Sequence, residues 1–238
     1  MNRDRVMIMF KQSQTSGDAR AIIWDLDGVI ADTAPYHMRA WQDTFQKMGI
    51  QFTEEDFRHS FGLRNDAILA RILGKGVSSD EINSISAGKE ETFRQMIGQN
   101  IRPLPGVIEL MRSLTEAGFP MALASSTPAE NIRLVTGRLG IKDYFRSIIA
   151  AEDVTKGKPH PQVFLLAAQE LGVSPGNCIV IEDAVAGITA ARRAGMRCLA
   201  VTTTHPRNNL KEADLIVDTL ESVTVNTLQK LLAHSSEL

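Results

Sequence analysis

The sequence predicts an α/β fold built on a mainly parallel sheet, with a helical segment inserted after the first strand. Six short apolar runs recur along the chain, and they do not alternate with polar residues, as is typical of strands buried on both faces. Helical patterns separate most of these runs, which favours strand–helix–strand units. Residues 35 to about 100 contain no such run and carry helical patterns only.

The individual elements follow from these patterns. The predicted strands are "AIIW" (21–24), "MALA" (121–124), "SIIA" (147–150), "CIVI" (178–181), "CLAV" (198–201) and "LIV" (215–217). The predicted helices of the sheet domain cover 105–118, 128–140, 161–172 and 184–195. The first two open with proline and close with glycine, a common arrangement at helix ends. Thr127 is the expected N-cap of the second.

Three parts of the chain are therefore expected. Residues 1–19 form an N-terminal extension, polar except for "VMIMF". Residues 20–34 and 101–238 form the α/β core domain, and residues 35–100 form a helical cap domain. An insertion at this point lies above the carboxyl ends of the strands, where open α/β sheets bind ligands.

Composition excludes several function classes. The 238 residues carry a net charge of −2, and 5% are aromatic. No nucleic acid or membrane partner is therefore expected, and "VMIMF" is too short for a signal or membrane segment. Cys178 and Cys198 lie in apolar runs and are interpreted as buried free thiols, which fits a reducing, cytoplasmic setting. We expect a monomer or a weak homo-oligomer.

Polar residues follow four of the six predicted strands. They are Asp25 and Asp27, then Ser125, Ser126 and Thr127, then Lys156 and Lys158, and finally Glu182 and Asp183. Taken singly, each group has an ordinary interpretation: a solvated turn, a helix cap, a surface loop, or acidic residues at a helix N-terminus. A parallel sheet, however, brings all these strand ends to one edge, which favours a shared site.

Such a cluster is suited to phosphoryl transfer. Several carboxylates at one point need a divalent cation, and hard oxygen ligands select Mg²⁺. Asp25 would attack phosphorus and form an aspartyl phosphate. Asp27 would donate a proton to the leaving oxygen and later accept one. The loop 125–127 would hold phosphate oxygens at a helix N-terminus, and Lys158 would add positive charge.

The stretches "DLDGV", "ALASS", "KGKP" and "IEDAVAGITAA" resemble, in order, the four motifs of the haloacid dehalogenase superfamily. The helical insertion resembles the cap of the subgroup that contains β-phosphoglucomutases and related sugar phosphatases. The resemblance implies a Rossmann-like core and a Mg²⁺ cofactor. It implies that Asp25 is the nucleophile, Asp27 the general acid–base with its backbone carbonyl on the metal, and Ser125 and Lys158 the phosphoryl-binding groups. Glu182 and Asp183 would complete the metal site.

The resemblance also implies roles for residues near the cap. Thr33 lies at the hinge into the cap, His37 and Trp41 lie on the first cap helix, and Ser126 follows the phosphoryl-binding serine. Thr33, His37 and Ser126 are substrate-binding candidates. His37 is either a substrate contact or a satisfied polar residue at the seam between cap and core. Trp41 is interpreted mainly as a core residue.

The cap loop "FGLRND" departs from the mutase pattern. Phe61 stands where that pattern has a phosphate-gripping lysine, and Asn65 stands at the arginine position, with Arg64 one residue earlier. Arg64 and Asn65 are the substrate-binding candidates of this loop. A helix turns about 100° per residue, so Arg64 does not face the way the arginine would.

The expected function is Mg²⁺-dependent hydrolysis of a small phosphate ester, such as a sugar phosphate, through an aspartyl phosphate. The alternative enzyme is a β-phosphoglucomutase that interconverts β-glucose 1-phosphate and glucose 6-phosphate. A non-catalytic binding module would usually lose Asp25, Asp27 or Lys158, and all three are present. A phosphoacceptor receiver domain would lack the helical insertion.

Overall fold

The computed structural model describes residues 19–74, 76–98 and 101–233. The predicted N-terminal extension lies, except for residue 19, outside the described residues. Six strands form one parallel sheet in the order β3-β2-β1-β4-β5-β6. They are β1 (Ala21–Trp24), β2 (Met121–Ala124), β3 (Ser147–Ile149), β4 (Cys178–Glu182), β5 (Arg197–Val201) and β6 (Leu215–Val217). The predicted α/β class with a parallel, Rossmann-like sheet is confirmed.

Two layers of helices cover the sheet, because successive residues of each strand face opposite sides. Ile22 and Trp24 of β1 belong to one apolar cluster, and Ala21 and Ile23 belong to another. The first cluster includes residues of α5, α6 and α9, and the second includes residues of α7 and α8. These helices are α5 (Val107–Glu116), α6 (Ala129–Leu139), α7 (Gln162–Leu171), α8 (Val185–Arg193) and α9 (Val225–Ala233).

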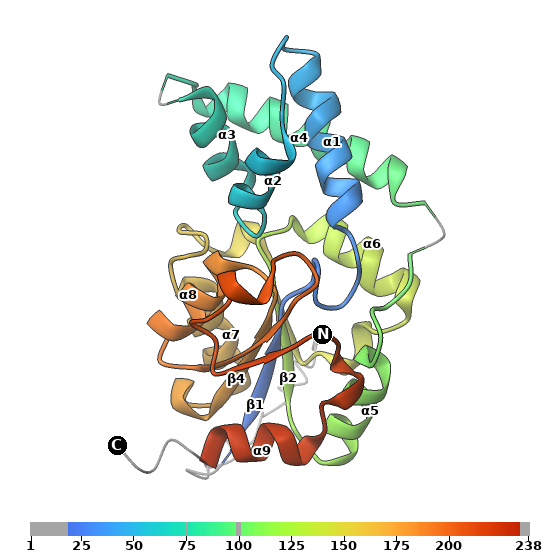
Figure 1. Cartoon of the computed structure of the whole chain (residues 1–238), viewed down its shortest axis with the longest axis vertical. Coiled ribbons are helices and arrows are strands. Elements are labelled where there is room, and N and C mark those ends of the chain that lie inside the picture. Colours follow the sequence, from blue (N-terminus) through green and yellow to red (C-terminus); the bar gives the residue numbers. More distant parts are fainter. Residues whose placement is uncertain (1–18, 75, 99–100, 234–238) are drawn as a thin grey trace, which may run out of the picture.

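Four further helices lie between β1 and α5, in the segment predicted to form a cap. They are α1 (Ala34–Gln46), α2 (Glu54–Ser60), α3 (Asn65–Leu73) and α4 (Ser79–Met96). Figure 1 shows them gathered at one end of the molecule, beyond the sheet. Their apolar cluster contains Trp41, Phe45 and Phe57, and Ala184 of the core domain joins it. The insertion is therefore packed on the core at this point.

Capping boxes mark the starts of two of these helices. Thr53 with Asp56 and Ser78 with Glu81 form capping boxes at α2 and α4. Thr33 precedes α1 without capping it, because its hydroxyl donates to Asp27 instead. None of the helices among the described residues is long and apolar enough to cross a membrane.

The expected N-cap role of Thr127 is wrong. Pro128 occupies the N-cap position of α6, and no side chain caps this helix. The hydroxyl of Thr127 donates to Oδ2 of Asp27. The side chain is therefore drawn toward the strand-end carboxylates rather than toward the helix.

The order of the strands determines where a site can form. β1 lies between β2 and β4, and the chain leaves β1 in one direction for β2 and β3 and in the other for β4, β5 and β6. Ligands bind in open α/β sheets at such a switch point, beyond the carboxyl ends of the strands. Asp25 and Glu182 stand at the ends of β1 and β4, on either side of this point.

Candidate active site

Lys158 joins two buried carboxylates at the carboxyl edge of the sheet. Its Nζ donates to Oδ1 of Asp25 at 2.6 Å and to Oε1 of Glu182 at 2.7 Å. It also lies 3.4 Å from the carbonyl of Ala124 and 4.9 Å from the ring centroid of Phe164. All three ammonium protons therefore have partners, and the predicted nucleophile is held by a fixed cation.

Glu182 is also held by the start of α8. Its Oε2 accepts from the backbone amides of Asp183 and Ala184 at 2.8 and 2.9 Å. Gly187 makes this position available, because a Cβ there would come within 1.7 Å of Oε1 of Glu182. The glycine in "AVAGITAA" is thus needed to admit the glutamate.

A cation fits beside these groups. One oxygen each of Asp25, Glu182 and Asp183 lie within 4.8 Å of one another. Asp183 is 1% exposed, and its Oδ1 is buried with no hydrogen-bond partner, although Oδ2 accepts from Thr204. A buried carboxylate oxygen without a partner is costly. Oxygen-only donors of this kind could hold a hard divalent cation.

The charges of the buried carboxylates also favour a cation at this place. Burial, together with the carboxylates of Glu182 and Asp27, raises the pKa of Asp25 to about 8, although Lys158 opposes this. Burial and the neighbouring carboxylates also raise the pKa of Asp183 well above its usual range. One lysine is therefore too little positive charge to keep all these groups ionised. A divalent cation would supply the rest.

Asp27 has a different environment, although it lies two residues from Asp25. Its Oδ1 accepts from Thr33 at 2.6 Å, and its Oδ2 accepts from Thr127. His37 Nε2 lies 3.3 Å from the same Oδ1. Burial alone would raise the pKa of Asp27, but His37 and these hydrogen bonds hold it well below its usual range. The side chain of Asp27 faces the insertion, so only its backbone is left for the predicted metal role.

The predicted phosphoryl-binding loop follows β2. The backbone amide of Ser125 donates to Ile149, and its hydroxyl accepts from the amide of Thr127 at 3.1 Å. The hydroxyl of Ser126 donates to the carbonyl of Gly62 at 2.8 Å. Ser126, a predicted substrate contact, therefore joins the core to the cap loop while also lining the cavity.

Two charged cavity residues are not among the candidates from the sequence, and both lie on α4. Lys89 and Glu90 are 2% and 4% exposed and form an ion pair at 2.9 Å. Ile82, Ile85 and Phe93 of the same helix pack on apolar clusters. Lys89 continues their spacing, three or four residues from its neighbours. A charged residue on an apolar helix stripe was the signal that could have found this pair.

The structure brings His37 into contact with this pair. Lys89 Nζ lies 2.8 Å from Nδ1 of His37. An ammonium has no lone pair, so Nδ1 accepts, and Nε2 carries the proton that is donated to Asp27. The His37 ring stacks on Phe93 with centroids 3.9 Å apart. Of the two interpretations of His37, the geometry favours a satisfied polar residue at the seam, in contact with the predicted acid–base.

The structure does not bring Arg64 to the cavity. Its Nη1 donates to the carbonyls of Ala151 and Val154, and its Nε pairs with Asp66 at 3.3 Å. Arg64 packs so closely on Gly157 that a Cβ there would come within 2.5 Å of its Cδ. The predicted substrate-binding role of Arg64 is therefore not supported by its position, because core carbonyls hold the guanidinium. Asn65 does line the cavity.

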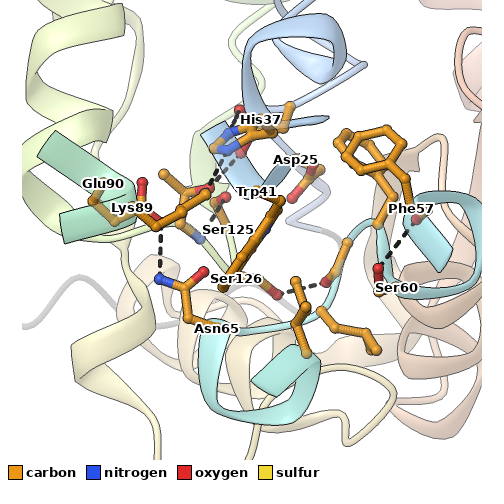
Figure 2. A pocket seen from close by; sticks show the side chains of 16 residues that line it. Asp25, His37, Trp41, Phe57, Ser60, Asn65, Lys89, Glu90, Ser125 and Ser126 are labelled. Carbon is orange, nitrogen blue, oxygen red and sulfur yellow. Dashed lines mark hydrogen bonds and ion pairs between the residues drawn. The ribbon is translucent and has the colours of Figure 1, made fainter. Parts of the chain in front are cut away.

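The cavity lies between the strand ends and the insertion. Sixteen residues line it, and the space that they surround, including its open mouth, is about 470 Å³. Asp25 and Ser125 lie on the core side. Figure 2 shows Lys89, Glu90 and Asn65 on one flank and Phe57 and Ser60 on the opposite flank. Trp41 lies between them, so it is both a cavity wall and a member of the apolar cluster of the insertion.

Comparison with known proteins identifies the family. The family described as "Hydrolase: haloacid dehalogenase-like hydrolase" matches residues 19–195. The chain is 36% identical over 220 residues to "Beta-phosphoglucomutase" of Bacillus subtilis, covering 89% of this chain and 94% of that protein. It is 33% identical over 180 residues to "Fructose-1-phosphate phosphatase YqaB" of Escherichia coli, covering 76% of this chain and 95% of that protein.

The fold agrees with these matches. A crystal structure of β-phosphoglucomutase from Clostridium difficile superimposes with a TM-score of 0.83 and 33% identity, covering 91% of this chain and 98% of that one. The chain also matches a much longer protein. It spans 21% of the Arabidopsis thaliana chloroplastic protein SUPPRESSOR OF QUENCHING 1, to which it is 33% identical.

Proposed function

This chain belongs to the haloacid dehalogenase-like hydrolases, and from that premise we propose that it is a Mg²⁺-dependent phosphatase of small phosphorylated metabolites, such as sugar phosphates. A cytoplasmic setting is part of the proposal. The observation that carries it is the group formed by Asp25, Lys158 and Asp183: a carboxylate fixed by a cation, beside a buried carboxylate oxygen that lacks a partner.

The reaction proceeds in two displacements. Asp25 attacks phosphorus, the ester P–O bond breaks, and the leaving oxygen takes a proton from Asp27. Water then attacks the aspartyl phosphate, gives its proton to Asp27, and phosphate leaves with Asp25 restored. The three donors on Asp27 favour its carboxylate form, which suits the second displacement. The first displacement requires the less populated form of Asp27 that carries a proton.

The metal would be held by Asp25, Asp183, Glu182 and the backbone of Asp27. Mg²⁺ at this point supplies positive charge that lets a phosphate dianion approach the carboxylates. Lys158 adds to that charge from the side of Glu182. The hydroxyl of Ser125 and the amides of the loop 125–127, which precedes α6, would bind phosphate oxygens.

β-Phosphoglucomutase is the second candidate, and the identity to the Bacillus subtilis enzyme of that name favours it. A mutase must hold a sugar bisphosphate while it reorients, which needs a second cationic site. Phe61 is 7% exposed and packs in the apolar cluster of the insertion. Arg64 is bound to core carbonyls. These observations favour hydrolysis.

A paired assay separates the two candidates. β-Glucose 1-phosphate is incubated with the protein, Mg²⁺ and a priming sugar bisphosphate, and both free phosphate and glucose 6-phosphate are followed. We expect phosphate to be released and glucose 6-phosphate formation to be weak or absent. Glucose 6-phosphate forming much faster than phosphate would contradict the phosphatase proposal. A panel of sugar phosphates in the same assay then identifies the preferred substrate.

A further inference from the structure

A buried ion pair forms the flank of the cavity opposite Phe57. Lys89 and Glu90 are adjacent on α4, both line the cavity, and each is less than a twentieth exposed. Adjacent helix positions do not usually face one way. They do so here because the two side chains bend together, with Nζ of Lys89 at 2.9 Å from Oε1 of Glu90. Figure 2 shows both beside Asn65.

The positive charge of this pair is already used. Lys89 Nζ is shared between Glu90 and Nδ1 of His37, and it lies 5.1 and 5.6 Å from the ring centroids of Trp41 and Phe93. Lys89 is the single lysine among the sixteen lining residues, and no arginine is among them. The only positive charge among the described residues of this flank is therefore already paired, and no free cation is left to bind an incoming anion.

The negative charge is held in place from three directions. In addition to Lys89, Asn65 Nδ2 donates to Oε1 of Glu90 at 2.8 Å, and Asn131 Nδ2 donates to Oε2 at 2.6 Å. Burial would raise the pKa of Glu90, but the charge of Lys89 and the hydrogen bonds from Lys89 and Asn65 lower it. Asn131 belongs to α6 of the core domain, so the carboxylate stays charged and fixed when the insertion is packed on the core.

We propose that Glu90 is a specificity-determining residue that restricts the enzyme to substrates with a single anionic group. A phosphate monoester would place its phosphate at Asp25 and its uncharged end, with hydroxyls, toward Glu90 and Asn65. A second phosphate at that end would meet a fixed carboxylate and a neutralised lysine. Discrimination of this kind rests on an unfavourable charge against the wrong ligand. The inference rests on the proposed phosphatase function, whose substrate class it narrows.

The test measures binding rather than turnover. In the Asp25→Asn background with Mg²⁺, calorimetry gives the dissociation constants of fructose 1-phosphate and fructose 1,6-bisphosphate, which differ by one phosphate. We expect the monophosphate to bind more tightly. Glu90→Gln removes the repelling charge and frees Lys89, so the ratio of the two constants should shift toward the bisphosphate by about tenfold or more.

Two further variants control for packing. Asn131→Ala removes the bond from α6 but leaves the charge on Glu90, so it should weaken both ligands by the same factor. Lys89→Gln should shift the ratio the other way, toward the monophosphate, and it serves as the test if Glu90→Gln does not fold. The proposal would be overturned if the ratio of the two dissociation constants is unchanged in Glu90→Gln. It would also be overturned if Asn131→Ala shifts this ratio as much as Glu90→Gln does, or if neither ligand binds.

The same proteins with Asp25 intact keep the two proposals apart. Release of phosphate from fructose 1-phosphate and from p-nitrophenyl phosphate reports the phosphatase function alone. If neither ester is hydrolysed but the binding ratio still shifts in Glu90→Gln, the charge selection by Glu90 stands and the phosphatase function fails. If the esters are hydrolysed but the binding ratio does not shift in Glu90→Gln, the phosphatase function stands and the charge selection by Glu90 fails.

Discussion

Arg64 and Asn65 are neighbours in the chain, but they bind different parts of the molecule. Arg64 donates to the carbonyls of Ala151 and Val154 in the core domain, whereas Asn65 donates to Glu90 within the insertion. The start of α3 is thereby fixed on one side to the loop after β3 and on the other to α4. The two residues hold the cavity wall between them.

Arg64→Ala should therefore raise the KM for the preferred sugar phosphate by roughly tenfold, because it removes the charge-assisted hydrogen bonds that hold the cavity wall in place, each of which contributes about 1.5–3 kcal/mol. The kcat should change much less, since Arg64 does not line the cavity. Steady-state kinetics measure both constants. Arg39→Ala is the matched control, because Arg39 lies on α1 in an exposed pair with Asp43. Equal KM values in the two variants would contradict the role given to Arg64.

The two predicted catalytic aspartates should fail in different ways. Asp25→Asn removes the nucleophile, so turnover and formation of the acid-stable phosphoenzyme should both disappear. Asp27→Asn leaves the nucleophile in place, so turnover should fall by about a hundredfold or more while burst phosphorylation by an ester with a good leaving group persists. Rapid-quench measurements separate the two. Normal turnover in Asp25→Asn would show that the nucleophile is misassigned.

The core and its strand-end residues could be predicted from the sequence because each is a local signal. The runs at 21–24, 121–124 and 215–217 match β1, β2 and β6 to the residue. A parallel sheet must bring the ends of its strands to one edge, so the sequence alone predicts that Asp25 and Asp183 lie together.

The cap side of the cavity could not be predicted in this way. The apolar stripe of α4 indicates that Lys89 lies on the buried face of the helix. Its contact with His37 of α1, however, depends on how two helices that are distant in the chain pack together. Thr127 shows the same limit, because a residue before a helix is usually a cap, and only the position of Asp27 decides otherwise. The place of Arg64 in the cap loop predicts a substrate contact, whereas its partners Ala151 and Val154 lie far along the chain.

Activity should depend on a divalent cation. Excess chelator should abolish phosphate release, and Mg²⁺ should restore it, because Asp25, Glu182 and Asp183 lie together in a buried site. Asp183→Asn should raise the Mg²⁺ concentration for half-maximal activity by at least about tenfold. Asp218→Asn, which changes an exposed carboxylate, is the control. Full activity in chelator would contradict this prediction.

Cys178 should not react in the folded protein. Burial raises the pKa of its thiol to about 12, so almost no thiolate exists at neutral pH. An aromatic disulfide reagent should label it quickly in denaturant and slowly without denaturant. In the unfolded chain the thiol ionises at its ordinary pKa, so the contribution of Cys178 to stability is lost as the pH rises from about 9 to about 12. Cys178→Ser should reduce that alkaline loss in pH-dependent unfolding.

Alanine substitutions at two glycines distinguish the effect of backbone strain from the effect of displacing a metal ligand. Gly28 and Gly49 both have a positive φ, of 79° and 72°, so the backbone strain of an alanine at either position should cost about 1 kcal/mol of folding free energy. A Cβ on Gly49 meets nothing within 4 Å, whereas one on Gly28 would lie 1.9 Å from Oδ2 of Asp183 and 2.7 Å from the hydroxyl of Thr204.

Gly28→Ala should therefore displace Asp183 and lose most of the activity and Mg²⁺ response, while Gly49→Ala should keep both. Chemical denaturation measures the shared cost, and Mg²⁺ titration of phosphate release measures the difference. Because the strain is matched, a loss of activity in Gly28→Ala alone can be assigned to the contact with Asp183. Similar Mg²⁺ activation curves for the two variants would mean that Asp183 does not hold the metal where its unpartnered oxygen indicates.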